Sequence, residues 1–138
     1  MTTQRALPGV LAAATLALAS ALTAGPAQAA PTVAGPSSSP APARTELLPP
    51  GAGVNCTTGH FCASVWDPGA NRFRVFYFYN CTRYYLSNWN GWGEAKNSQT
   101  GNATATLYGS GGNVLRTVPA DNGVYAVDWA PVYSLRNC

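Results

Sequence analysis

Two stretches of the chain share the pattern that decides the fold. The first reads Ala63-Ser-Val-Trp-Asp-Pro-Gly-Ala-Asn-Arg-Phe-Arg-Val-Phe76, and the second reads Ala105-Thr-Leu-Tyr-Gly-Ser-Gly-Gly-Asn-Val-Leu-Arg-Thr-Val118. Their alignment pairs Trp66 with Tyr108, Gly69 with Gly111, Asn71 with Asn113 and Arg74 with Arg116. After a gap of two residues the match resumes, pairing Tyr85, Asn88 and Trp89 with Tyr125, Asp128 and Trp129, and Lys96-Asn97 with Arg136-Asn137. These recurrences in order indicate an internal duplication, with units of about forty residues.

The two units have the composition of an all-β domain. Short runs of strand formers alternate with Gly, Asn, Pro and Asp, and all fifteen aromatic residues of the chain follow Val54. No window shows helical periodicity long enough for a helix. We therefore expect each unit to form a Greek key, and the two units to pack as a β-sandwich. The expected core residues are Trp66, Phe73, Phe76, Tyr85, Trp89 and Trp129. The run from Arg72 to Tyr79 carries aromatics on both faces, so this strand is either buried on both sides or exposes an aromatic face.

The segments before this domain indicate export. Residues 1–29 resemble a cleavable signal peptide, with Arg5, an uncharged run rich in Ala and Leu, and Ala27-Gln28-Ala29 before the cut. Residues 30–53 are rich in Pro, Ala, Ser and Gly, which predicts an extended, flexible linker. A propeptide is the alternative, because Ala43-Arg44 offers a basic cleavage point. The folded domain is then expected over residues 54–138 of a secreted protein.

The cysteines fit that location. Cys56, Cys62, Cys81 and Cys138 all follow the expected cleavage site, and an even number in a short exported chain indicates two disulfides. Three pairings are possible. We favour Cys56–Cys62, because Thr57-Thr58-Gly59 between them can turn the chain back, and this leaves Cys81–Cys138. The spacing does not match a zinc site, even with His60 as a further ligand.

Several motifs resemble a known family. The segment Cys56-Thr-Thr-Gly-His-Phe-Cys62 is similar to the opening of secreted actinobacterial proteins grouped with the microbial metalloproteinase inhibitor. The segment Tyr85-Leu-Ser-Asn-Trp-Asn-Gly-Trp-Gly93, Asn97-Ser-Gln-Thr100 and the ending Asp128-Trp-Ala-Pro-Val-Tyr-Ser-Leu-Arg-Asn-Cys138 resemble one branch of that group. The resemblance covers residues 54–138. It implies a βγ-crystallin-like double Greek key and a peptidase inhibitor.

The chain departs from this family at two places. The characterised inhibitor type holds its reactive loop in a second short Cys-to-Cys staple in the later half, where this chain has only Cys138. No reactive bond can therefore be carried over. Calcium-binding βγ-crystallins carry a ligand motif at positions that correspond to residues 90–95 and 128–133, but neither stretch fits it. We expect no cofactor, with calcium as the remaining alternative.

The residues do not favour catalysis. His60 is the only histidine, and it lies between two cysteines that are expected to be bonded, so a polar turn residue is its simplest role. Asp67 and Asp121 stand in the turn contexts Asp-Pro-Gly and Asp-Asn-Gly, which argues against a pair of carboxylates in a cleft. We expect that the protein is not an enzyme.

Three readings of function remain. The first is an inhibitor that binds the cleft of a secreted protease, with Asp67 to Asn71 and Pro119 to Gly123, which includes Asp121 and Asn122, as candidate loops. The second is a module that binds glycan or cell wall through Trp92, Tyr77 and Tyr79. The third is an extracellular structural module without a ligand. The basic residues are scattered, so nucleic acid and membrane are not expected as partners, and we expect a monomer.

Overall fold

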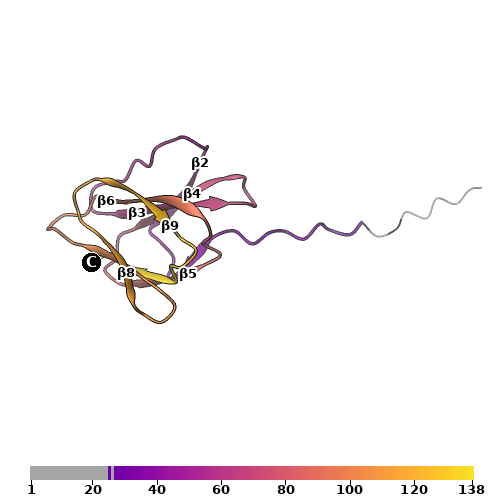
Figure 1. The fold of residues 1–138 in the computed structure, drawn as a ribbon. Helices are drawn as coiled ribbons and strands as arrows, with labels where there is room; N and C mark the ends of the chain where they lie inside the picture. Colours follow the sequence, from indigo (N-terminus) through magenta and orange to yellow (C-terminus); the bar gives the residue numbers. More distant parts are fainter. Residues whose placement is uncertain (1–24, 26) are drawn as a thin grey trace, which may run out of the picture. The chain divides into compact units, whose positions relative to one another are not determined.

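The computed structural model describes residue 25 and residues 27–138, and its folded unit comprises Pro31–Cys138 (Figure 1). The expected signal peptide therefore lies outside the described residues, apart from residue 25 and residues 27–29. The described part of the chain contains no helix with the length and hydrophobicity that crossing a bilayer requires.

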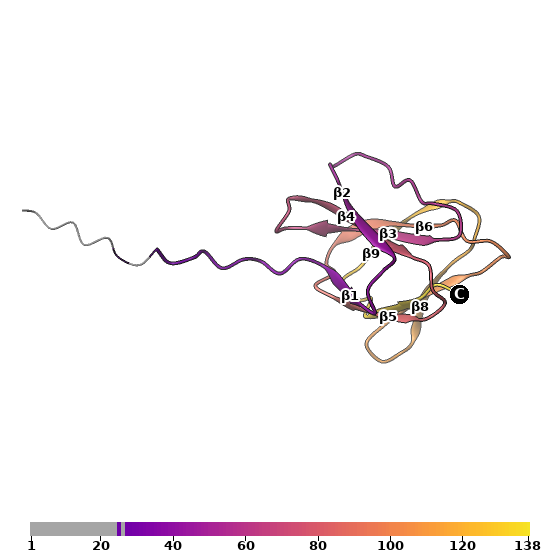
Figure 2. The same ribbon diagram turned by 180° about the vertical axis from the view of Figure 1, so that it is seen from behind.

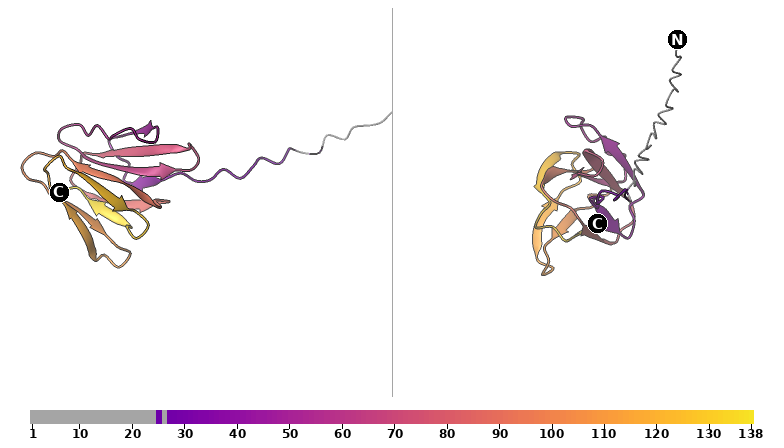
Figure 3. Two further views of the ribbon diagram at one scale, coloured as in Figure 1. Left: turned by 45° about the horizontal axis from the view of Figure 1, so that its top comes forward. Right: turned by 90° about the vertical axis from the view of Figure 1, so that its right-hand side faces the viewer.

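The folded unit is all-β, as the sequence predicts, and consists of two five-stranded antiparallel sheets (Figure 3). Sheet I has the order β2-β4-β3-β6-β9, and sheet II has the order β1-β5-β10-β7-β8. The strands of sheet I are β2 (Arg44–Leu48), β3 (Phe61–Asp67), β4 (Arg72–Phe78), β6 (Trp92–Asn97) and β9 (Val124–Asp128). The strands of sheet II are β1 (Ser37–Ser39), β5 (Arg83–Ser87), β7 (Ala105–Tyr108), β8 (Val114–Val118) and β10 (Ser134–Arg136).

The two repeat units exchange one strand each. The first unit places β3, β4 and β6 in sheet I but sends β5 to sheet II. The second unit places β7, β8 and β10 in sheet II but sends β9 to sheet I. The order β4-β3-β6-β9 in one sheet therefore matches β8-β7-β10-β5 in the other, in agreement with the duplication. Because each sheet needs a strand from both units, neither unit can complete its sheet alone.

The two repeated tryptophans meet in the core between the sheets. Trp89 follows β5 and Trp129 follows β9, so each stands at the end of an exchanged strand. Their ring centroids are 4.9 Å apart with an edge-to-face geometry, and both side chains are buried. The Trp129 indole donates a hydrogen bond to the Ser64 carbonyl oxygen on β3 at 2.8 Å. The pair thus joins the two exchanged strands through one contact.

The expected core is correct in part. Phe76, Trp89 and Trp129 are buried, whereas Trp66 and Phe73 are only partly buried and pack against each other. Tyr85 was expected in the core, and this is wrong, because its side chain is 60% exposed. Strand residues alternate between faces, and on β5 the inward positions belong to Tyr84 and Leu86.

Two repeated asparagines fasten the units to each other. The Asn97 side-chain amide donates to the carbonyl oxygens of Ala103 at 2.8 Å and Val118 at 2.9 Å, on the second unit's side. Asn137 donates to the Phe78 carbonyl oxygen of the first unit at 3.4 Å. Both asparagines are fully buried. The recurrence of the basic–Asn pair in the sequence therefore corresponds to a reciprocal hydrogen-bonded contact between the units.

Residues 30–53 are not the flexible linker that the composition predicts. We call this segment the N-terminal arm. It contributes β1, which pairs with β5, and β2, which pairs with β4, so it extends both sheets on one side (Figure 2). On the other side β8 and β9 remain edge strands. The linker prediction is wrong because an edge strand pairs through its backbone, which leaves no hydrophobic period in the sequence.

The arm and the residues after it also cover the outward face of β4, the strand that carries aromatic residues on both faces. Phe76 and Phe78 of β4 face the core between the sheets, whereas Val75 and Tyr77 face outward. A second buried cluster covers these two residues, with Val54, Cys56, Cys62 and Leu48 as its other members. Strand β4 is therefore buried on both sides, the first of the two expected outcomes.

The structure has the disulfides Cys56–Cys62 and Cys81–Cys138, the two pairs that the sequence favours. Their Cα atoms are 5.7 Å and 5.4 Å apart, respectively. The first disulfide closes the short loop before β3. The second ties the chain between β4 and β5 to residue 138, so it joins segments of both repeat units.

The close approach of Trp129 to β6 generates a stability prediction. A Cβ at Gly93 would overlap the Ser64 carbonyl oxygen and stand 2.7 Å from the Trp129 indole nitrogen. We expect Gly93→Ala to lower the free energy of unfolding by about 3 kcal/mol, because the buried backbone and the indole must both move. Gly53→Ala is the matched control, since a Cβ there meets nothing within 4 Å. Denaturant unfolding of the two variants checks this; equal stabilities would show that Gly93 is not required by packing.

Candidate functional site

The structure separates the three aromatics that were expected to bind glycan. Trp92 begins β6 and is 67% exposed. It lines a groove of about 310 Å³ between the edge strands β8 and β9. Tyr79 follows β4, is 61% exposed and packs against His60, with ring centroids 5.1 Å apart. Tyr77 is fully buried, so its expected role as an exposed binding aromatic is wrong. Arg44 of the arm and the segment after the arm cover it. The prediction of a flexible linker over residues 30–53 leaves out the part of this cover that the arm supplies.

The first predicted inhibitory loop, Asp67 to Asn71, is a tight hairpin turn. The Asp67 carboxylate accepts hydrogen bonds from the backbone nitrogens of Gly69 at 3.0 Å and Ala70 at 3.2 Å. It also forms an ion pair with Arg74 at 2.6 Å. Burial alone would raise the pKa of Asp67, but the hydrogen bonds and the positive charge of Arg74 outweigh it and hold this pKa below its usual value. Asn71 adopts a left-handed backbone conformation, with φ of 51°.

The second predicted loop, Pro119 to Gly123, is closed in a similar way. Asp121 accepts hydrogen bonds from the Gly123 nitrogen at 2.8 Å and from the Tyr125 hydroxyl at 2.5 Å. The hydrogen bond from Tyr125, followed by that from Gly123, lowers the pKa of the Asp121 carboxyl. The backbone of Asn122 has φ of 58°, and its nitrogen donates to the Asn97 carbonyl oxygen. Both predicted loops are therefore compact turns that their own aspartates stabilise.

A third loop has a different construction. Residues 49–55 connect β2 to the Cys56–Cys62 disulfide, and Pro49 to Gly53 are exposed. A hollow of about 240 Å³ separates this loop from sheet I, lined in part by Leu48, Val54 and Phe73. We call residues 49–55 the arm loop. Its outer surface is accessible, and its short sequence carries two prolines and two glycines.

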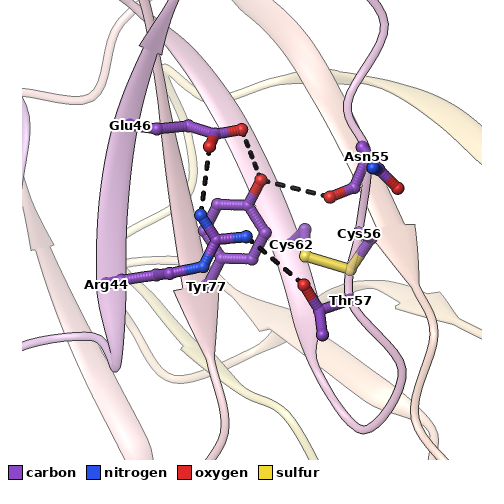
Figure 4. Close-up of polar contacts among 7 residues, drawn as sticks. All are labelled: Arg44, Glu46, Asn55, Cys56, Thr57, Cys62 and Tyr77. Carbon is purple, nitrogen blue, oxygen red and sulfur yellow. Dashed lines mark hydrogen bonds and ion pairs between the residues drawn. A yellow bond between two sulfur atoms is a disulfide. The ribbon is translucent and has the colours of Figure 1, made fainter.

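Tyr77 holds both ends of the arm loop (Figure 4). Its hydroxyl donates to a Glu46 carboxylate oxygen on β2 at 2.5 Å and contacts the Asn55 carbonyl oxygen at 3.2 Å. Glu46 lies three residues before the loop, and Asn55 is its last residue. One hydroxyl group thus connects the strand that enters the loop with the residue that leaves it.

Arg44 completes this cluster, which we call the Tyr77 clamp. Strand register places Arg44 opposite Tyr77, and Tyr77 opposite Cys62, on one face of sheet I. The Arg44 guanidinium lies 3.5 Å from the centroid of the Tyr77 ring, forms an ion pair with Glu46 at 3.0 Å and donates to the Thr57 hydroxyl at 3.3 Å. The guanidinium therefore covers the ring while it binds residues on both sides of the loop.

The Tyr77 clamp raises the pKa of the Tyr77 hydroxyl. Burial of the ring, the hydrogen bond to Glu46 and the negative charge of Glu46 raise the pKa of Tyr77 to about 12, although Arg44 opposes the shift. The phenol is therefore neutral at physiological pH and remains a donor to Glu46. The Tyr77 clamp is therefore a structural anchor, in which the Tyr77 hydroxyl has its hydrogen-bond partners in place.

The clamp was missed because its parts are distant in the sequence. Arg44 and Glu46 belong to the segment read as a linker, and Tyr77 was read as a ligand-binding ring. The sequence Arg44-Thr45-Glu46-Leu47-Leu48 has no alternation of apolar and polar residues that would predict a strand, and only the pairing of β2 with β4 shows that it forms one. Among residues 25 and 27–138, no three or more His, Cys, Asp or Glu side chains gather in a way that could hold a metal ion.

The clamp generates a prediction about alkaline stability. The folded pKa of Tyr77 lies above the ordinary value of 10, so the folded state resists ionisation that the unfolded state undergoes. This contribution is complete below pH 10 and is lost as the pH rises through about 12, a change of about 2 to 3 kcal/mol in the free energy of unfolding. We expect Tyr77→Phe to cost about 1 to 3 kcal/mol at pH 8 and to remove this part of the alkaline loss.

Urea unfolding at pH 8 and at pH 11 measures both effects, and about half of the alkaline loss is reached at pH 11, midway between the unfolded and folded pKa values. Tyr79→Phe is the matched control, because Tyr79 is exposed and should leave the stability and its pH dependence unchanged. If Tyr77→Phe and wild type lose stability in parallel between pH 8 and pH 11, Tyr77 does not cause the alkaline loss.

We compared the chain with models of protein families, with curated proteins and with solved structures, and none matches. The resemblance drawn from the sequence motifs therefore stays a prediction.

Proposed function

We propose that the protein is a secreted inhibitor of an extracellular metallopeptidase, and that the arm loop enters the cleft of the enzyme. The observation that carries this proposal is the attachment of an exposed loop at both ends to one buried side chain, Tyr77. A loop fixed in this way loses little conformational entropy when it binds. The motifs between Cys56 and Cys138 that resemble the microbial metalloproteinase inhibitor group favour the same reading.

The arm loop suits this role better than the two loops first considered. The turns at residues 67–71 and 119–123 are closed by hydrogen bonds that their own aspartates accept. The arm loop also contains a turn, in which the Ala52 nitrogen donates to the Pro49 carbonyl oxygen at 3.2 Å, but only the arm loop is attached at both ends to one buried side chain. The arm loop is anchored at its ends and open at its middle. Pro50, Gly51 and Ala52 at its exposed part are compact residues that a narrow cleft accommodates.

The body of the protein supports the same proposal. An inhibitor must resist cleavage by the enzyme that it binds. The two disulfides restrain the unfolding that proteolysis requires. Disulfides also agree with export, since they persist in oxidising surroundings. The exchange of β5 and β9 between the sheets supports a βγ-crystallin-like double Greek key as the framework.

Inhibition assays on a panel of secreted zinc and serine peptidases test the proposal. We expect at least one metallopeptidase to be inhibited with a dissociation constant below about 1 μM. Reduction of the disulfides should abolish inhibition. Ala52→Trp should weaken it at least tenfold, because the bulky ring stands at the exposed part of the loop. Thr100→Trp, at an exposed position in another loop, is the matched control and should inhibit normally.

Two results would contradict the proposal. One is the absence of inhibition across the metallopeptidases at concentrations of the order of 100 μM. The other is rapid cleavage between residues 49 and 55 with release of active enzyme, which would make the arm loop a substrate. Equal loss of inhibition in Ala52→Trp and Thr100→Trp would keep the inhibitor but reject the arm loop as its binding element.

A further inference from the structure

The outer face of sheet II carries an ordered set of polar and aromatic side chains. Tyr84 of β5 and Leu135 of β10 point into the core, so their strand neighbours point outward. The register places Tyr85, Ser134 and Tyr108 side by side across β5, β10 and β7. It places Arg83, Arg136 and Thr106 side by side in the next row.

The second row holds two arginines next to each other. Arg83 and Arg136 are direct cross-strand partners, an arrangement that costs stability because their charges repel. The guanidinium of Arg83 lies 3.9 Å from the centroid of the Tyr108 ring, and Arg136 contacts the sulfur of Cys138 at 3.5 Å. Neither arginine is paired with a carboxylate among the described residues; the ion pairs there are those of Arg44 and Arg74.

The acidic residues of the protein lie elsewhere. Four of them, Glu46, Asp67, Glu94 and Asp128, belong to strands of sheet I, and Asp121 lies in the turn before β9. The described part of sheet II contains no carboxylate side chain, so the positive charge of Arg83 and Arg136 remains available on this face. An anion that approaches it meets two guanidinium groups and no acidic side chain of sheet II.

A groove runs beside these two rows. It has a volume of about 480 Å³, and its lining includes Arg83, Tyr85, Tyr133 and Ser134 together with residues 109–112. Arg136 is the cross-strand neighbour of Arg83 and lies beside the groove, outside its lining. Tyr85 and Tyr133 are 60% and 57% exposed, although most large aromatic side chains of the protein are covered. The small residues of the hairpin at 109–112 form one part of the wall of the groove.

We propose that this groove binds an acidic polysaccharide, a polymer of sugars that carry carboxylates. Exposed tyrosine rings pack against the apolar face of a sugar ring and offer their hydroxyls to its polar edge. Guanidinium groups bind carboxylates with paired hydrogen bonds and remain charged at every physiological pH. Arg83 in the groove, with Arg136 beside it on the next strand, therefore selects for an anionic sugar, and Tyr85 and Tyr133 select for a ring rather than a simple ion.

The face is less suited to nucleic acid. Binding of a phosphate backbone relies on several cations along a track, whereas this face carries two arginines on adjacent strands. The site is also separate from the arm loop, which lies on sheet I. Binding of glycan and inhibition of a peptidase can therefore be tested independently.

Titration calorimetry with polygalacturonate, at about 50 mM salt, tests this proposal. The neutral comparison is the same polymer with its carboxylates methyl-esterified. We expect binding of polygalacturonate and at least tenfold weaker binding of the ester. The double variant Arg83→Gln/Arg136→Gln should bind at least tenfold more weakly than wild type, and so should Tyr85→Ala. Thermal melting should be unchanged in Tyr85→Ala, because the side chain is exposed.

Two matched controls distinguish binding in the groove from the general effect of losing a positive charge or an exposed aromatic ring. Arg72→Gln removes an exposed arginine of β4, and Tyr79→Ala removes a tyrosine as exposed as Tyr85. Both should bind polygalacturonate like wild type. The proposal is overturned by absence of binding, by equal affinity for the esterified polymer, by equal losses in the control variants, or by tighter binding of single-stranded DNA. Inhibition by Tyr85→Ala should be normal, so failure here leaves the proposed inhibitor untouched.

Discussion

The edge-to-face contact between Trp89 and Trp129 is the constraint on which the rest of the structure depends. Each tryptophan follows a strand that has crossed to the opposite sheet, so their contact fixes where both crossings end. The hydrogen bond from Trp129 to Ser64 passes over Gly93, where a larger residue has no space. The contact between the Trp89 and Trp129 rings thus governs the packing of the core, the ends of the two exchanged strands and the requirement for glycine at position 93.

The outer surfaces of the two sheets differ in how far they are covered. Sheet I is largely covered on the outside of β4, where Tyr77 organises the arm, the disulfide loop and the segment between them. Sheet II leaves Tyr85 and Arg136 exposed on its outer face. The duplicated framework therefore does not imply duplicated surfaces, because only one of the two sheets receives the cover supplied by residues 48–56.

The sequence predicted features that depend on local pattern. The repeat was visible because glycines and tryptophans at turns and in the core recur in order, and the favoured cysteine pairing followed from the turn between Cys56 and Cys62. The prediction placed Tyr85 on the wrong face of its strand. An error of one residue in the inward positions moves every side chain of a strand to the opposite face of the sheet. The site residues were harder still: Arg44 and Tyr77, or Arg83 and Arg136, become neighbours only through strand register, which no local pattern specifies.

The proline-rich arm has a consequence for the solubility of the protein. Without it, the seven-residue strand β4 and the five-residue strand β5 would present long rows of unpaired backbone groups to other molecules. The arm replaces the edge of β5 with three serines between Pro36 and Pro40, and it places Pro42 and Pro49 on either side of β2. A proline has no backbone N–H to offer a neighbouring strand. On this side, the sheets end in strands that another copy of the chain is poorly able to extend, so the arm protects the β-sandwich from growing edge to edge.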